Sequence, residues 1–244
     1  MCIRDSIYSL HLFSIIVPRE EKNEQYKECL KVLVKSLEEL QNRDGGWSYH
    51  RAPRPGMGYS ESFTTAPGII ALVQAKKSVE VPKEILEKSV KCINSFHRTD
   101  KAYEYWKVMP SRPGRDMIEG CAARLPVCTL SLFLNKEKKL SDLEEAMEVF
   151  FKYKEKLQRV RKNPVYHVDK YWNAAYYFFF GYYYATLCAN HLSEELQDKY
   201  FPLIRKDILD IGENDGSWVD HYTFGKPYGT AAALLILKNT SKAE

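Results

Sequence analysis

The stretch "NAAYYFFFGYYYATLCA", residues 173–189, decides the fold of this chain. Nearly every position holds an aromatic or other apolar residue, with small residues between the rings. A helix that is hydrophobic on all sides is buried on all sides. The stretch is also too short and too rich in tyrosine to cross a membrane. It therefore predicts an internal helix surrounded by other helices.

Four further segments have the same all-round apolar character. They are "DSIYSLHLFSII" (5–16), "TTAPGIIALVQA" (64–75), "CAARLPVCTLSLFL" (121–134) and "GTAAALLIL" (229–237). Taking Ser6, Thr65, Ala122, Ala174 and Thr230 as helix starts, the spacings are 59, 57, 52 and 56 residues. Between these segments lie helical patterns that are apolar on one face and charged on the other, as expected of surface helices.

A regular alternation of buried and amphipathic helices indicates a repeat architecture, in which no unit buries its apolar face alone. We expect an all-α fold, an α/α toroid with an inner and an outer layer of helices. A leading inner helix at about 6–17 precedes hairpins at about 24–77, 82–135, 141–190 and 194–238. The whole chain, 1–244, is predicted to form one such domain.

Two of the expected outer helices end in an Asp-Gly-x-Trp motif. The copies are "QNRDGGWSYH" (41–50) and "GENDGSWVDH" (212–221), and Asp44 and Asp215 are 171 residues apart, which is three periods of 57. Gly45 and Gly216 are predicted to take the left-handed conformation that ends a helix. Trp47 and Trp218 are expected to cover the joint between neighbouring hairpins.

The charge distribution and the cysteine spacing argue against several classes of function. The net charge of +4 is spread along the chain, which favours solvated helix faces over a nucleic-acid interface. The six cysteines show no paired spacing, so neither a metal site nor a cofactor is expected. The N-terminus lacks the pattern of a signal peptide and no segment reads as a membrane span, while the compartment stays undetermined.

The motif Gln41-x-x-x-Gly45-x-Trp47 resembles the QW motif of triterpene cyclases. By hairpin period and loop motif, essentially the whole chain resembles the prenyltransferase/squalene-cyclase repeat family, the terpenoid cyclase-like toroids. Members of that family have more hairpins than the four and a half found here. The resemblance therefore implies an N-terminally truncated member that lacks hairpins of its own chain.

The resemblance also implies an apolar isoprenoid-type small molecule, bound or transformed in an aromatic-lined central cavity. Thr65-Ala66 match the end of the DxDD-T-A acid motif, but Phe63 stands where the proton-donating Asp would be, and only Glu61 retains a carboxyl. The Asp-x-Cys zinc pair of prenyltransferases is absent. So is the GCxEQ thioester motif, because Gly120-Cys121 is followed by Ala-Ala-Arg. Whether the chain is an enzyme is left open.

Equivalent ends of successive hairpins lie on one rim of a toroid, so the loops before the inner helices should converge. In such a site Asp116 and Glu119 are the candidate acids, and His167 and His221 the candidate proton-transfer groups, because histidine titrates near neutral pH. The candidate substrate-binding residues are Tyr49, His50, Arg115, Arg124, Tyr171, Trp172, Tyr176, Tyr222 and Tyr228.

Two other functions remain open at this point. One is a non-catalytic interaction or scaffold toroid. The other is a carbohydrate-active toroid that uses paired carboxylates, such as Asp116 and Asp220, about 5 to 10 Å apart, with aromatic rings as sugar platforms. A deep aromatic cavity favours isoprenoids, an open groove with two facing carboxylates favours sugars, and a filled centre favours scaffolding.

Overall fold

The computed structural model of the chain describes residues 3–19, 23–49, 58–107, 114–165 and 167–241. Within these residues the regular elements are helical, with three isolated β-bridges and no strand. The elements are α1 (Ile3–Ile16), η1 (Val17–Arg19), α2 (Asn23–Glu39), α3 (Ser62–Ala75), α4 (Lys83–Phe96), α5 (Leu125–Leu134), α6 (Leu140–Val160), α7 (Tyr177–Ala189), α8 (Glu194–Leu209) and α9 (Gly225–Asn239).

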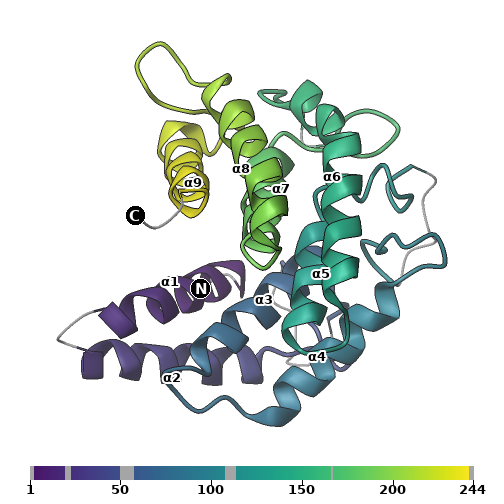
Figure 1. Cartoon of the computed structure of the whole chain (residues 1–244). Coiled ribbons are helices and arrows are strands. Elements are labelled where there is room, and N and C mark those ends of the chain that lie inside the picture. Colours follow the sequence, from purple (N-terminus) through teal and green to yellow (C-terminus); the bar gives the residue numbers. More distant parts are fainter. Residues whose placement is uncertain (1–2, 20–22, 50–57, 108–113, 166, 242–244) are drawn as a thin grey trace.

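The helices form two layers. Each odd-numbered helix packs against the next odd-numbered one, from α1 through α3, α5 and α7 to α9. The even-numbered helices lie outside them (Figure 1). Helices α4, α6 and α8 each pack on the inner helices before and after them, and α2 packs on α1. This is the predicted α/α toroid architecture, with a leading inner helix and four hairpins.

The inner helix α7 is buried as its sequence predicts. Phe178, Phe179 and Tyr182 on α7 have no exposed surface. The first and last inner helices differ, because each packs along only one inner neighbour. Leu12 on α1 is 54% exposed and Leu234 on α9 is 56% exposed. The expectation of burial on all sides is therefore wrong for these two helices.

Two inner helices begin later than predicted. Residues 114–124 form turns, so α5 begins at Leu125 rather than at Ala122. Pro126 lies in its first turn, where a missing N–H costs no helical hydrogen bond. The helix α7 begins at Tyr177 rather than at Ala174. The apolar composition continues from turn into helix, so it cannot locate the boundary.

Within the described residues, the turn of the Asp-Gly-x-Trp motif occurs three times rather than twice. In each copy, two backbone hydrogen bonds close the turn. The residue three positions before the left-handed residue accepts a hydrogen bond from the N–H of the left-handed residue. The N–H of that same earlier residue donates to the carbonyl of the residue that follows the left-handed one. The donor–acceptor pairs of the closing bond are Asn42–Gly46, Arg98–Ala102 and Glu213–Ser217, at 2.9, 2.9 and 2.8 Å. The left-handed residues are Gly45 (φ 90°), Lys101 (φ 67°) and Gly216 (φ 77°). The sequence Asp100-Lys101-Ala102-Tyr103 is thus a further copy, 56 residues after the first.

The two tryptophans tie the outer helices α2 and α8 to the inner helices that follow them. The indole Nε1 of Trp47 donates to the carbonyl of Leu37 at 2.8 Å, and that of Trp218 donates to Ile208 at 2.7 Å. Their backbone N–H groups donate to the hydroxyls of Thr65 and Thr230, at 3.0 and 3.1 Å. Both tryptophans therefore serve the predicted structural joint.

Candidate functional site

The loops before the inner helices do converge. A chain of ring contacts runs from Tyr49 to Phe63 (centroids 6.3 Å apart) and from Phe63 to Tyr177 (4.8 Å). It continues from Tyr177 to Tyr176 (4.8 Å) and from Tyr176 to Phe224 (5.9 Å). Residues that are up to 175 positions apart thus form one aromatic cluster at the N-terminal ends of α3, α7 and α9.

A cavity of about 310 Å³ opens beside this cluster, among α1, α3, α7 and α9. Its lining residues are Asp5, Tyr8, Phe63, Tyr176, Phe180, Phe224 and Tyr228. The volume lies at the lower end of the range of about 300–1,000 Å³ for small-molecule sites. Among these lining residues Asp5 carries the one carboxylate, and the two tyrosines Tyr8 and Tyr228 are partly exposed.

The rings of Tyr49, Tyr105 and Tyr177 pack against Phe63, which lines the cavity. The hydroxyls of Tyr49 and Tyr105 are 2.7 Å apart and hydrogen-bonded. Burial raises the pKa of Tyr49, Tyr105 and Tyr177 well above the usual value for tyrosine. These phenols therefore stay neutral at physiological pH and act as hydrogen-bonding groups rather than as bases.

Asp116 is held inside the protein, away from the cavity. Arg115 donates to its carboxylate at 2.6 and 3.1 Å, and the backbone N–H of Tyr105 donates at 2.9 Å. A second guanidinium, that of Arg124, lies 3.8 Å from the same carboxylate and donates to the carbonyls of Arg115 and Tyr103. All three charged side chains are buried. This network organises the turns that precede α5.

Asp220 and His221 are buried and do not line the cavity. Asp220 is fully buried and accepts a hydrogen bond from the backbone N–H of Phe179 at 3.4 Å. Burial raises the pKa of Asp220 well above that of an ordinary aspartate, although Arg161 lowers it in part. The buried His221 ring lies against Tyr176 and Phe224, 6.3 and 5.6 Å between centroids. His221 thus supports two cavity-lining rings.

The remaining predicted site residues are dispersed. His167 is exposed, and its Nδ1 lies 3.1 Å from the carbonyl of Trp172, whose side chain is also exposed. Tyr171 packs under the ammonium of Lys156, at 4.1 Å from the ring centroid. Glu119 is half-buried, Tyr222 is exposed, and His50 lies outside the described residues.

Of the predicted residues, Tyr176 and Tyr228 line the cavity. Sequence reasoning missed the other five lining residues, which are Asp5, Tyr8, Phe63, Phe180 and Phe224. Phe63 was considered only as the replacement for a catalytic acid. Phe180 and Tyr8 lie within all-round apolar segments, where the sequence does not separate cavity-lining from packed positions.

Among the residues that the structure describes, no group of three or more His, Cys, Asp and Glu side chains lies close enough together to hold a metal ion. No helix in the described part of the chain combines the length and apolarity needed to cross a bilayer.

No protein-family model matches the chain, and no curated protein is similar to it in sequence. Similarity appears among solved structures. A mutant alpha-2-macroglobulin from Salmonella aligns with 100% of this chain at 12% identity and a TM-score of 0.57, over 16% of its own length. A glycoside hydrolase family 76 protein (mannosidase) from Bacteroides thetaiotaomicron aligns with 98% of this chain at 14% identity and a TM-score of 0.57, over 70% of its own length.

A second family 76 glycoside hydrolase, from a bovine Bacteroides thetaiotaomicron strain, aligns with 98% of the chain at 13% identity and a TM-score of 0.54. The chain spans 55% of that protein and about a sixth of the macroglobulin. At such identities the similarity establishes the fold and leaves the prenyltransferase/squalene-cyclase family unconfirmed. The chain is an all-helical α/α toroid, similar in architecture to these macroglobulins and family 76 glycoside hydrolases.

Proposed function

We propose that this chain binds a small carbohydrate in the cavity among α1, α3, α7 and α9, without hydrolysing it. The observation that carries the proposal is the lining itself: six aromatic rings, three of them phenols, with one carboxylate. The solved structures support the class of ligand, because two of the similar toroids are glycoside hydrolases and one is described as a mannosidase.

A sugar presents apolar C–H faces and a rim of hydroxyls, so its binding site needs both flat apolar surfaces and hydrogen-bonding groups. Tyrosine supplies both, since its ring is apolar and its hydroxyl both donates and accepts. Tyr8 and Tyr228 lie at the exposed part of the lining, and Tyr176 lies deeper. Asp5 would accept hydrogen bonds from two sugar hydroxyls through its two carboxylate oxygens.

Binding without hydrolysis follows from the carboxylates. Glycoside hydrolysis ordinarily requires two carboxyl groups on either side of the scissile bond, about 5 to 10 Å apart. Among the residues that line the cavity, Asp5 alone carries one. Asp116 is neutralised by buried arginines, and Asp220 is buried behind Phe179. Neither aspartate lines the cavity.

An isoprenoid is the second candidate ligand, and a specific observation favours it. Three of the lining rings, Phe63, Phe180 and Phe224, have no polar atom, and Phe63 and Phe180 stack with centroids 3.8 Å apart. Phe63 also occupies the sequence position that holds the acid in the terpene-cyclase motif. A wall of this kind would hold an apolar chain, but the phenols and the carboxylate would then lack polar partners from the ligand.

The test is ligand-observed NMR with methyl α-mannoside and methyl β-glucoside, and with farnesol in parallel. We expect saturable binding of a glycoside, and weakening of about fivefold to tenfold on Tyr228→Ala, because a lost ring contact is worth about 1 kcal/mol. Tyr222→Ala is the matched control, since Tyr222 is 63% exposed and outside the lining.

Saturable binding of farnesol alone would select the isoprenoid, and binding of neither ligand class would reject the cavity as the site. Hydrolysis of nitrophenyl mannoside that disappears in Asp5→Asn would overturn the statement that the chain binds without cleaving.

A further inference from the structure

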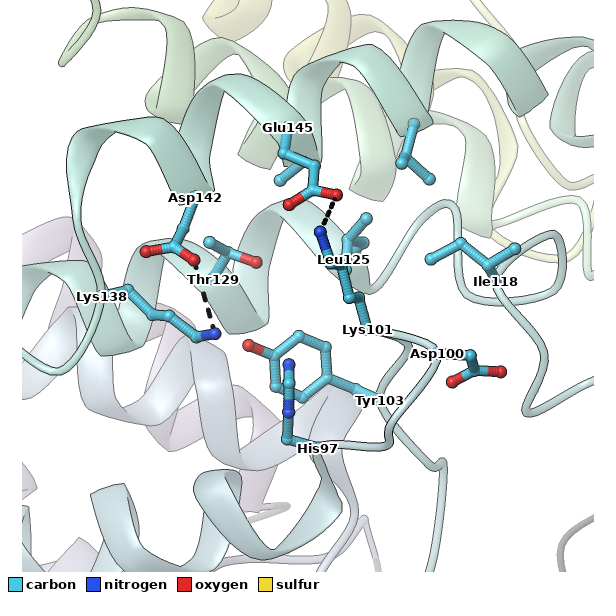
Figure 2. Close-up of a pocket in the computed structure, with 12 residues that line it drawn as sticks. His97, Asp100, Lys101, Tyr103, Ile118, Leu125, Thr129, Lys138, Asp142 and Glu145 are labelled. Atoms are coloured by element: carbon cyan, nitrogen blue, oxygen red, sulfur yellow. Dashed lines mark hydrogen bonds and ion pairs between the residues drawn. The ribbon is translucent and has the colours of Figure 1, made fainter.

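The second joint borders another cavity, whose lining shares no residue with that of the cavity among α1, α3, α7 and α9. It measures about 210 Å³ and lies between the turn at 97–103 and the helices α5 and α6 (Figure 2). Its wall includes Lys101, Tyr103, Thr129, Lys138, Asp142 and Glu145. None of these residues takes part in the proposed carbohydrate site.

The joint beside this cavity has Lys101 at its left-handed position, where the first joint has Gly45. At the first joint the backbone of Gly45 packs directly on α4, and a Cβ atom there would lie 2.4 Å from the carbonyl oxygen of Lys88. Lys101 occupies the same position at the second joint and reaches across to Glu145 on α6, at 2.6 Å. A side chain thus spans the distance between the second joint and the following outer helix. The groove at the first joint is lined only by the end of α2 with the adjoining turn, and by α4.

The tyrosine of this joint has an unsatisfied hydroxyl. Its counterparts Trp47 and Trp218 donate their indole N–H to carbonyls at the ends of α2 and α8. The hydroxyl of Tyr103 is buried and has no partner at full hydrogen-bond geometry among the described residues. The nearby Thr129 hydroxyl offsets only part of the rise in the Tyr103 pKa that burial causes. Buried polar groups nearly always have a partner, because leaving one unpaired costs its desolvation. The unpaired hydroxyl, on a residue that lines a cavity, therefore points to a partner from outside the chain.

Charges of both signs flank Tyr103. Lys101 pairs with Glu145 at 2.6 Å, and Lys138 pairs with Asp142 at 3.5 Å. Figure 2 shows the Tyr103 ring between these two pairs, with its hydroxyl on the side of Thr129 and Lys138. Pairs that are partly exposed to solvent contribute little to stability, so a ligand that brings its own charges can replace them at low cost.

The rest of the wall consists of His97, Asp100 and four apolar residues. Ile118, Leu125, Ala146 and Val149 line the cavity beside the charged groups. A ligand that matches this wall carries a positive group, a negative group and a short apolar part within a small volume.

We propose that this cavity binds a free α-amino acid with an apolar side chain. The ligand carboxylate accepts a hydrogen bond from Tyr103 and pairs with Lys138, while its ammonium group pairs with Glu145. Its side chain packs on Leu125 and Val149. Lys138 and Asp142 separate on binding, which opens the path to the hydroxyl. This site is independent of the central cavity, and either proposal can fail alone.

Calorimetric titration of the full chain with L-leucine tests the proposal. We expect saturable binding of L-leucine, and at least tenfold weaker binding of N-acetyl-L-leucine and L-leucinamide, which each lack one of the two charges. Absence of saturable L-leucine binding would overturn the proposal. Equal affinity for all three compounds would do so as well, because recognition would then not depend on both charges.

Three variants locate the site. Tyr103→Phe removes only the hydroxyl, and Lys138→Met and Glu145→Gln each remove one charge with little change of shape. Each should weaken L-leucine binding by about fivefold or more, as expected for loss of one hydrogen bond or ion pair to a charged ligand. Glu144→Gln and Lys139→Met are the matched controls, because both residues neighbour the site in sequence without lining it. Wild-type affinity in the three site variants, with unchanged thermal unfolding, would place the ligand elsewhere and reject the assignment.

Discussion

The indole Nε1 of Trp47 donates a hydrogen bond to the carbonyl oxygen of Leu37, 2.8 Å away in the last turn of α2. That carbonyl lacks its usual helical donor, because the N–H of Gln41 bonds to Glu38 instead. Helix ends leave such carbonyls unpaired unless a cap supplies a donor. The tryptophan of the joint is therefore both a cover for the core and a C-terminal cap, and Trp218 does the same for Ile208 on α8.

We expect Trp47→Phe to destabilise the protein more than Trp218→Phe. Both variants lose the capping hydrogen bond, but Trp47 is fully buried whereas Trp218 is half-buried. The cavity left by the smaller ring adds to the first loss, so about 2–3 kcal/mol is expected for Trp47→Phe and about 1 kcal/mol for Trp218→Phe. Urea unfolding followed by circular dichroism measures both. Equal losses would show that burial of the Trp47 indole adds nothing to the lost hydrogen bond.

Alanine substitutions at Gly45 and Gly216 distinguish the destabilisation caused by backbone strain from that caused by steric contact. Gly45 and Gly216 both have positive φ, but a Cβ at Gly45 would meet the carbonyl of Lys88 at 2.4 Å, while nothing lies within 4 Å at Gly216. Gly216→Ala should therefore cost about 1–2 kcal/mol of strain alone. Gly45→Ala should cost clearly more, since α4 must also move. Denaturant titration of the two variants gives the difference, and a larger loss at Gly216 would contradict the packing of α4 on this joint.

The sequence predicts the layers of this fold because burial leaves a direct trace in composition. The 173–189 segment has no polar face, so the sequence predicts that it is internal. The period of about 56 residues follows from the spacing of this segment and the four other apolar segments. The second joint was missed because Lys101 and Tyr103 replace Gly and Trp, although Asp100 keeps its place in the period. Lysine adopts the left-handed conformation only at a cost in free energy, so a lysine in the sequence does not predict a left-handed residue.

The site was less predictable than the fold. Asp116 and Asp220 are both aspartates at the start of an inner hairpin segment, and only the coordinates show that one faces two arginines and the other a backbone N–H. The lining of the central cavity depends on which side of an apolar helix faces an open space. Phe180 and Phe179 are adjacent in one aromatic run, yet the first lines the cavity and the second does not.

Lys136 offers a stabilising substitution. It follows α5 with φ 64°, and its N–H and that of Glu137 bond to the carbonyls of Phe133 and Leu132, at 2.9 and 3.0 Å. This is the Schellman cap, in which glycine is the favoured left-handed residue. We expect Lys136→Gly to raise the free energy of unfolding by about 1 kcal/mol. Glu137→Gly is the control and should lower it by about 0.4–1 kcal/mol, since no strain is relieved there. A thermal shift of the same sign in both variants would contradict the strain at Lys136.

The two buried aspartates should respond oppositely to conversion into asparagine. Asp116→Asn leaves the guanidinium groups of Arg115 and Arg124 buried without their counter-charge. Removing one partner of a buried ion pair costs about 3–5 kcal/mol, so this variant should be strongly destabilised at pH 7. Chemical denaturation of Asp116→Asn checks this, and a loss below about 1 kcal/mol would show that the arginines find other partners.

Asp220→Asn should instead leave the protein at least as stable at pH 7 and change its pH dependence. Burial raises the pKa of Asp220 in the folded protein, whereas the unfolded chain releases this proton at a pKa of about 3.9. Above that pH the folded state binds the extra proton, so this carboxyl lowers the stability progressively as the pH rises toward the folded pKa. Asparagine resembles the neutral acid and cannot ionise, so the variant should lose less stability than the wild type between pH 4 and pH 7. Unfolding free energies measured across that range test the sign: an unchanged pH profile would mean that Asp220 is already ionised in the folded protein, and a steeper loss of stability with rising pH in the variant would reverse the assignment.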